Sequence, residues 1–173
     1  MWYVIQVRTG SEEKIVVQCQ KIIQEQDCEG SALRKCFIPY YEQKRRYEGA
    51  WHTEQKKLFP GYVFLVSDNL EQLHESLTEI VGLTKLLGIG EEIVPLMEEE
   101  VQWLKKLGGD SQVVEASIGV IEHDEIRIVS GPLEGMEGCI KKIDRHKRLA
   151  WLEVAMMGRI MEVQVGLEVV EKR

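Results

Sequence analysis

The chain has 173 residues, a net charge of −7 and an apolar fraction of 44%, which is ordinary for a globular protein of one domain or two small ones. No apolar run approaches the roughly 20 residues that a membrane helix needs, and no signal-like segment opens the chain, so we expect a cytoplasmic protein with no membrane partner. No metal or cofactor site is predicted, because the four histidines form no ligand pair and the cysteines fit no zinc spacing: Cys19, Cys28, Cys36 and Cys139.

Charge is distributed unevenly along the chain. Through Glu122 there are 13 Lys/Arg against 20 Asp/Glu, a net charge of −7, whereas from His123 onward there are nine of each, a net charge of zero. The second part is therefore the less repulsive one for nucleic acid, although neutrality is not a positive patch.

The first elements read as a strand, a helix and a hairpin. Trp2 to Arg8 is rich in β-branched and aromatic residues, and Thr9 or Ser11 can cap a helix that follows it. Further on, Lys44 to Tyr47 forms a basic run that we interpret as the tip of a hairpin. The simplest explanation of that run is a solvated loop.

The segment Leu58 to Val66 is the longest run of large apolar residues in the first half of the chain. A bend is predicted at Pro60-Gly61, followed by a strand with apolar side chains on both faces. Pattern alone favours a central strand covered on both sides. The alternative is a groove, lined by Phe59, Tyr62 and Phe64, that a partner fills.

Two further helices are predicted. Asp68 can cap the first of them in a capping box with Glu71, and Pro95 precedes the second, which carries acidic residues in its first turn. The order strand, helix, strand, strand, helix, strand, helix suggests an antiparallel sheet with helices packed on it, hence an α+β fold.

From Asp124 the pattern changes to five short strands without helices, which predicts a small barrel of the SH3 type. The last of these strands is expected at Val169-Val170. Gly135 and Gly138 are expected to supply turn geometry that a residue with a Cβ would resist. Residues 109–122 are the candidate linker. We found no phosphate-binding loop, zinc helix or nucleophile elbow, so no enzyme activity is predicted.

Three motifs in this order resemble the NusG family of transcription elongation factors: the Trp2-Tyr3 strand, Phe59-Pro60-Gly61-Tyr62-Val63, and Gly131-Pro132-x-x-Gly135-x-x-Gly138. The resemblance covers nearly the whole chain. It implies an NGN domain at 1–108, a linker at 109–122 and a KOW domain at 123–173.

The resemblance also implies a hydrophobic groove on the NGN domain that grips the clamp helices of RNA polymerase. Phe59, Tyr62 and Phe64 match the family's aromatic segment, and Val101 and Leu104 are candidates for the opposite wall. His74 and Thr78 lie where the family can approach the non-template DNA strand, although a solvated helix face is the simpler explanation.

A basic cluster follows in the second part of the chain. On a hairpin these side chains can converge on a phosphate backbone, or they can simply form a charged, solvated turn. The tail around the cluster resembles the LoaP branch of NusG proteins, antiterminators whose KOW domain is associated with an RNA hairpin in the leader transcript. The resemblance thus implies a monomeric antiterminator with the following RNA-binding residues: Lys141, Lys142, Arg145, His146, Lys147, Arg148 and Arg159.

Two alternatives stay open. A housekeeping NusG factor would use the KOW domain to bind proteins through an apolar loop surface, but the corresponding turn is basic in this chain. A KOW-containing RNA-binding or ribosome-assembly protein that never contacts polymerase would not need the Trp2 strand or the Phe59 segment.

Overall fold

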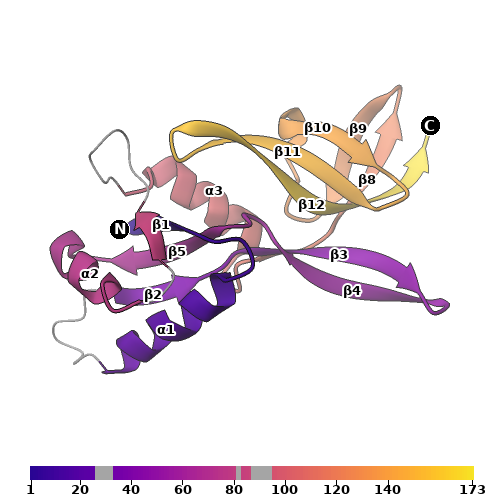
Figure 1. Ribbon diagram of the computed structural model, residues 1–173. Coiled ribbons are helices and arrows are strands. Elements are labelled where there is room, and N and C mark those ends of the chain that lie inside the picture. Colours follow the sequence, from indigo (N-terminus) through magenta and orange to yellow (C-terminus); the bar gives the residue numbers. More distant parts are fainter. Residues whose placement is uncertain (26–32, 81–82, 87–94) are drawn as a thin grey trace. The chain divides into compact units, whose positions relative to one another are not determined.

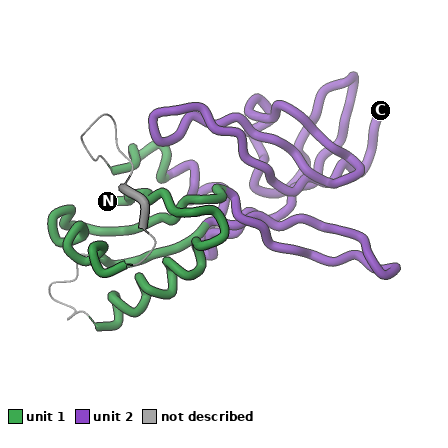
Figure 2. The backbone as a smooth tube through the Cα atoms, viewed as in Figure 1, with its two compact units in different colours: residues 1–38, 59–101 green, residues 39–58, 102–173 purple. Residues whose placement is uncertain are grey.

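The computed structural model describes residues 1–25, 33–80, 83–86 and 95–173, so Cys28 lies outside the described part of the chain. Two compact units are formed: unit 1 comprises residues 1–38 and 59–101, and unit 2 comprises residues 39–58 and 102–173 (Figure 2). No helix among the described residues is long and apolar enough to cross a membrane.

Unit 1 is built on a four-stranded sheet in the order β2-β5-β1-β6, in which every pair is antiparallel (Figure 1). Its strands are β1 (Trp2–Val7), β2 (Leu33–Phe37), β5 (Tyr62–Ser67) and β6 (Leu83–Leu86). Because β5 lies between two neighbours, the expectation of a central strand is confirmed. Its side chains Val63, Phe64 and Leu65 are all buried, which covers both faces of the strand.

The described residues form three helices: α1 (Glu12–Glu25), α2 (Leu70–Leu77) and α3 (Glu98–Gly108). In unit 1, α1 packs on β2 and β5 through its buried residues Ile15 and Cys19. The predicted capping box at Asp68 is wrong. Asn69 caps α2 by accepting from the backbone N–H of Gln72 at 3.2 Å, and Asp68 instead forms an ion pair with Arg34.

The bend before β5 is confirmed and is tied to the start of α1. Gly61 has a φ of +86°, a backbone conformation that favours glycine. The fully buried Glu12 accepts hydrogen bonds at Oε1 from the backbone N–H groups of Gly61, at 3.1 Å, and Gly10, at 2.9 Å. One carboxylate therefore accepts hydrogen bonds from the backbone amides of two loops that are far apart in sequence.

Aromatic rings form the centre of the unit 1 core. The Phe64 ring lies 5.6 Å from the rings of both Phe37 and Phe59, and the Phe37 ring meets Trp2 edge-on at 5.1 Å. Phe59 and Phe64 are 1% and 0% exposed. These contacts make both residues major contributors to the packing of the unit.

Unit 2 contains a long hairpin of β3 (Tyr40–Tyr47) and β4 (Ala50–Lys57), with β7 (Val113–Val114) parallel to β3. Glu48 and Gly49 form its two-residue turn with φ values of +54° and +76°, as expected for a tight hairpin turn. The predicted hairpin is thus confirmed, but its basic run lies along β3 rather than at the tip.

The remaining strands of unit 2 form a sheet in the order β10-β11-β12-β8-β9. They are β8 (Ser117–Glu122), β9 (Glu125–Ser130), β10 (Ile140–Asp144), β11 (Leu149–Met156) and β12 (Arg159–Lys172). The separate strand expected at Val169-Val170 is wrong, because β12 runs continuously through these residues. Its second half pairs in parallel with β8, an apolar segment that we expected to be linker. Since a strand edge needs a partner, each segment satisfies the other.

The glycines of the Gly-Pro turn differ in their roles. Gly131 has a φ of +105°, and a Cβ there would lie 2.7 Å from Ser117 Oγ, which accepts the Leu133 N–H at 3.0 Å. Gly135 also has a positive φ, +77°, as expected. The expectation for Gly138 is wrong: it sits in a short 3-10 helix, η1 (Glu137–Cys139), where a Cβ would meet nothing within 4 Å.

Candidate nucleic-acid interface

A hydrogen bond between a side chain and the backbone stabilises the basic turn between β10 and β11. Asp144 Oδ1 accepts the Lys147 N–H at 2.9 Å, and this hydrogen bond is the main reason that the pKa of Asp144 is lowered. Arg148 closes the turn with a φ of +55°. Arg145, His146 and Lys147 are thereby left exposed, while Arg148 is half-buried.

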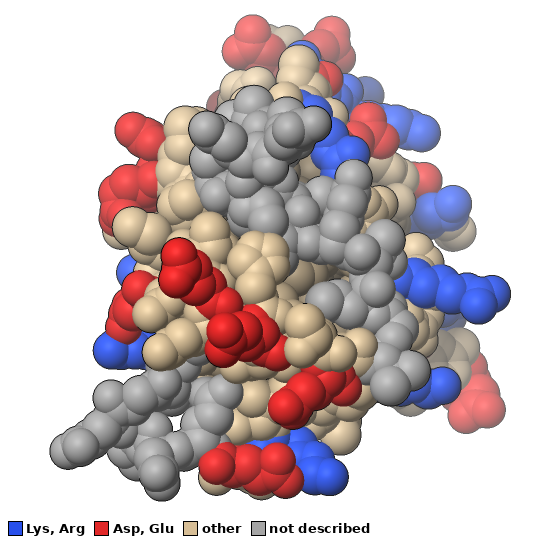
Figure 3. Space-filling model, turned by 60° about the vertical axis from the view of Figure 1, so that its left-hand side comes forward, with Lys and Arg blue, Asp and Glu red and all other residues tan. Residues whose placement is uncertain are grey.

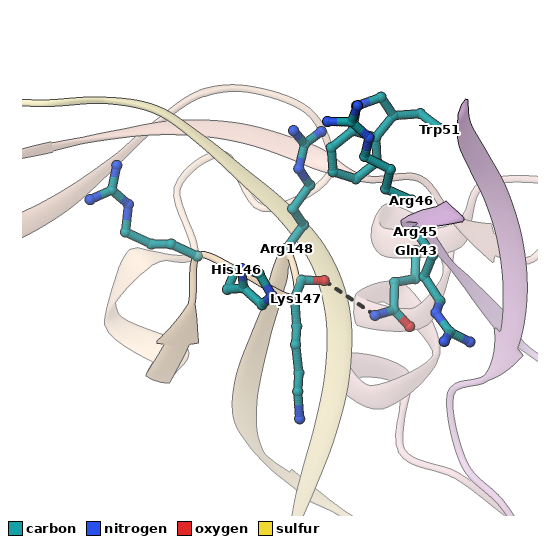
Figure 4. A pocket seen from close by; sticks show the side chains of 8 residues that line it. Gln43, Arg45, Arg46, Trp51, His146, Lys147 and Arg148 are labelled. Atoms are coloured by element: carbon teal, nitrogen blue, oxygen red, sulfur yellow. Dashed lines mark hydrogen bonds between the residues drawn. The ribbon is translucent and has the colours of Figure 1, made fainter. Parts of the chain in front are cut away.

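Only part of the predicted RNA-binding set comes together. Arg145, His146, Lys147 and Arg148 line a single pocket of about 580 Å³ (Figure 4). Lys141, Lys142 and Arg159 are exposed but do not line it. Lys142 instead places its ammonium nitrogen 4.8 Å from the centroid of the Trp151 ring on β11.

The β3–β4 hairpin supplies the other wall of the pocket. Its contributing residues are Gln43, Arg45, Arg46 and Trp51. Figure 4 shows Arg148 directed at the Trp51 ring, with its guanidinium carbon 3.6 Å from the ring centroid. The pocket therefore combines side chains that are about 100 positions apart in sequence, since the Gln43–Lys147 separation is 104.

Several contacts join the hairpin to the turn and to β12 within unit 2. The Gln43 side-chain amide donates to the Lys147 carbonyl at 3.2 Å, drawn as the dashed line in Figure 4. The Tyr41 hydroxyl donates to Gln164 Oε1 at 3.1 Å. Gly166 lies so close to β3 that a Cβ there would collide with the Glu42 carbonyl oxygen. Burial at this junction raises the pKa of Tyr41.

The pocket lining is rich in basic side chains. Five of its eight lining residues are Lys or Arg, and none of the eight is Asp or Glu. Glu168 stands beside it and pairs with Arg148 at 3.3 Å and Lys44 at 3.7 Å. Unit 2 carries 16 Lys/Arg and 15 Asp/Glu, a net charge of +1, whereas unit 1 carries 6 and 14, a net charge of −8.

Sequence reasoning noticed the basic run on β3 but missed Gln43 and Trp51. The two-residue turn at Glu48-Gly49 was a usable signal, because it sets the register that places Arg46 opposite Trp51. No sequence signal placed the hairpin beside the β10–β11 turn.

The residues predicted to bind polymerase differ in accessibility. Phe59, Phe64, Val101 and Leu104 are all buried, at 1%, 0%, 6% and 7% exposed. Tyr62, at the start of β5, is partly exposed. Four of the five candidates are therefore packing residues in this structure, and Tyr62 is the one that a partner can reach directly.

The two residues predicted to face DNA lie on one exposed face of α2. His74 is followed one turn later by Thr78, whose backbone N–H donates to the His74 carbonyl at 3.2 Å. Glu71 and Glu75 are exposed on the same short helix. Figure 3 shows acidic side chains across the middle of one face of the molecule. With Glu71 and Glu75 beside them, His74 and Thr78 are less suited to a phosphate than the pocket in unit 2.

The described residues contain no group of three or more His, Cys, Asp or Glu that could hold a metal ion. The Cys19 and Cys36 thiols share a hydrogen bond inside unit 1. That bond and burial raise the pKa of Cys36.

Comparison with known proteins agrees with this architecture. Residues 1–105 match the family model described as "Transcription termination factor nusG". The chain is 28% identical to the transcription termination/antitermination protein NusG of Staphylococcus aureus strains Mu50 and N315, over 99% of this chain and 94% of theirs. Its fold is similar to that of a NusG structure from Thermotoga maritima, with a TM-score of 0.61 and 24% identity, covering 95% of this chain and 92% of that one. The chain belongs to the NusG family of transcription termination/antitermination factors.

Proposed function

We propose that this protein is a specialised antiterminator of the LoaP type, which binds a structured leader RNA through its carboxy-terminal part. The observation that carries this proposal is the gathering of Arg145, Lys147 and Arg148 around a pocket without a lining carboxylate. Such a site suits a polyanion, because each phosphate contact replaces condensed counterions on the nucleic acid. Double-stranded RNA offers mainly phosphates, 2′-hydroxyls and shape, which a basic hairpin can contact.

In this proposal residues 1–108 form the NGN domain, 109–122 the linker and 123–173 a KOW domain of the SH3-like barrel type. The open strand order described above leaves β9 and β10 at the two ends of the sheet. Assignment of the KOW domain therefore rests on the Gly131-Pro132 motif and on β9 to β12, whereas the fifth strand of the sheet, β8, lies in the segment assigned as linker. The protein acts as a monomer, which sedimentation of the purified chain tests.

RNA binding is tested with the full-length protein and a set of leader RNA hairpins at two salt concentrations. The test variant replaces Lys141, Lys142, Arg145, Lys147 and Arg148 with Gln. A matched control removes five other exposed lysines: Lys14, Lys21, Lys35, Lys106 and Lys172. We expect hairpin-selective binding that only the test variant loses, and a weaker salt dependence for that variant. Equal binding by the two variants contradicts the proposal.

The NGN domain is proposed to bind the clamp helices of RNA polymerase. Tyr62 is the accessible aromatic residue of the candidate groove, and truncated aromatic anchors commonly cost about 2 kcal/mol or more. Tyr62→Ala should therefore weaken binding to core polymerase by about thirtyfold or more, measured with a folded variant. The other four candidates are buried, so their substitution should act mainly through folding: Phe59, Phe64, Val101 and Leu104.

Contact with the non-template DNA strand is proposed for His74 and Thr78 on α2. Since acidic residues share this helix, the contact would involve bases rather than phosphates. Cross-linking of an elongation complex through a photoreactive residue at position 78 tests it, with position 71 as the control. Absence of any DNA adduct at position 78 would remove these residues from the proposal.

If the RNA experiment fails while Tyr62→Ala still weakens polymerase binding, the protein is a housekeeping NusG factor whose KOW domain binds protein partners. If neither polymerase nor RNA binding is found, the NGN assignment of function falls as well.

A further inference from the structure

The pocket in unit 2 has three kinds of chemistry on its walls. The first is cationic, from Arg45, Arg46, Arg145, Lys147 and Arg148. The second is a planar stack, in which the Arg148 guanidinium covers the Trp51 ring. The third is an acceptor: Gln43 is 5% exposed, and its side-chain oxygen Oε1 has no hydrogen-bond partner in the described residues.

The orientation of the Gln43 amide follows from its contacts. Its nitrogen donates to the Lys147 carbonyl, and the amide oxygen could not take that place because it carries no hydrogen, so Oε1 is the atom left over. A buried acceptor without a donor costs free energy comparable to a lost hydrogen bond. An amino or hydroxyl group of a bound molecule would relieve that cost.

The Trp51–Arg148 contact offers a flat surface on which a ring can stack. Trp51 is 48% exposed although Arg148 lies against it, so that a further ring can reach either the indole or the guanidinium plane. Unpaired RNA bases stack on both kinds of surface. A pocket of about 580 Å³ is also within the size range of small-ligand sites, which a single nucleotide fits.

We propose that the β3–β4 hairpin and the β10–β11 turn form one composite site for an unpaired nucleotide of the bound RNA. The base stacks on the Trp51–Arg148 pair, and the flanking phosphates lie against Arg46, Arg145 and Lys147. Gln43 holds the two elements together through the Lys147 carbonyl and offers Oε1 to a base amino group or a 2′-hydroxyl. This inference rests on the proposed RNA-binding function and adds a second chain segment, residues 43–51, to its site.

An acidic or phosphorylated peptide is the competing occupant. The cations alone would suit it equally well. The exposed indole and the unpartnered acceptor are features that a carboxylate or phosphate group does not use, because these groups supply acceptors and no flat ring. The same RNA experiment distinguishes the two occupants.

The experiment uses the full-length protein and two versions of each hairpin RNA that the protein binds selectively. The bulged RNA has one unpaired nucleotide in its stem, and the stem of the other is fully paired. Trp51→Ala is the main variant, and Trp51→Phe keeps a smaller ring. Tyr47→Ala is the matched control, because Tyr47 is another exposed aromatic residue of the hairpin, 44% exposed, that does not line the pocket. Folding is checked by circular dichroism.

We expect Trp51→Ala to weaken binding of the bulged RNA by about 5- to 150-fold, the range for loss of one base–aromatic stack. The fully paired RNA should lose much less, Trp51→Phe should restore part of the affinity, and Tyr47→Ala should change neither. Arg46→Gln should reduce the slope of log affinity against log salt by about 0.7 to 1, the value of one phosphate contact.

Three results would overturn the proposed site, each in a different way. In the first, the fivefold Gln variant of the basic cluster loses all RNA binding, while Trp51→Ala and Arg46→Gln bind like the wild type. The basic cluster alone then binds RNA, and the proposed function survives. If the wild type binds no hairpin RNA, both fall, and an acidic peptide becomes the occupant to test. Equal affinity for a DNA hairpin of the same sequence would overturn the assignment of the site to RNA.

Discussion

Aromatic side chains are used differently in the two compact units. In unit 1, Phe37 and Phe59 both lie against Phe64, and all three rings are buried. In unit 2, Trp51 is nearly half exposed, and its neighbour is the guanidinium group of Arg148. The surroundings carry opposite charge as well, with −8 for unit 1 and +1 for unit 2. The neighbours of an aromatic residue, and not the residue type alone, therefore decide whether it belongs to a core or to a binding surface.

The largest effect is expected in the core of unit 1. Phe64→Ala removes a fully buried ring and leaves a cavity, so it should destabilise the protein by about 3–5 kcal/mol. Phe64→Leu, which keeps most of the apolar contact, should cost clearly less. Urea unfolding monitored by circular dichroism measures both. A loss below about 1 kcal/mol for Phe64→Ala would mean that this ring is not a core residue and would favour a role in partner binding.

A smaller effect is expected at the junction of the hairpin with β12. Gly166→Ala places a Cβ against the Glu42 carbonyl oxygen, and overpacking of this kind typically costs about 1–3 kcal/mol. Gly135→Ala is a useful comparison. The added Cβ would meet no atom within 4 Å, but the alanine backbone would have to adopt a φ of +77°. If the hairpin separates from β12 in Gly166→Ala, Trp51 should no longer contribute to the RNA affinity of this variant.

This loss can be measured as a coupling between Gly166→Ala and Trp51→Ala in their effects on RNA affinity. In the Gly166→Ala background, Trp51→Ala should have little further effect on RNA affinity, since the pocket walls no longer meet. Full additivity of the two substitutions would contradict the view that Gly166 allows this close approach.

The smallest effect on stability is expected at Trp51 itself. An exposed cation–π contact is worth about 0.5–1 kcal/mol, so Trp51→Ala and Arg148→Ala should each destabilise the protein only slightly. Thermal unfolding of these variants beside Phe64→Ala compares the two units directly. A loss at Trp51 as large as that at Phe64 would show that Trp51 serves packing, and the difference drawn between the units would not hold.

Much of unit 1 could be predicted from the sequence. The alternation of apolar residues after Pro60-Gly61 correctly indicated a central strand, because a strand places successive side chains on opposite faces. The bend itself followed from glycine at position 61. The acceptor role of Glu12 was not predictable, since its two amide partners come from separate loops.

The second half was less predictable. Short apolar segments indicated strands, but nothing local showed that Ser117–Glu122 would pair in parallel with the end of β12. Likewise, Lys44 to Arg46 were interpreted as a solvated loop, because their charges do not indicate that the β10–β11 turn lies beside them. Strand pairing and charge clustering between distant segments are set by non-local contacts.

The sequence by itself therefore determined the local elements, the NusG family motifs and the basic character of Arg145 to Arg148, since each depends on residues close together in the chain. Only the tertiary structure decided that Phe59 and Phe64 are buried and that Gln43 and Trp51 face the basic turn. The physical reason is that burial and pocket formation depend on which distant surfaces meet. At Gly166, the absence of a single Cβ allows two of these surfaces to approach.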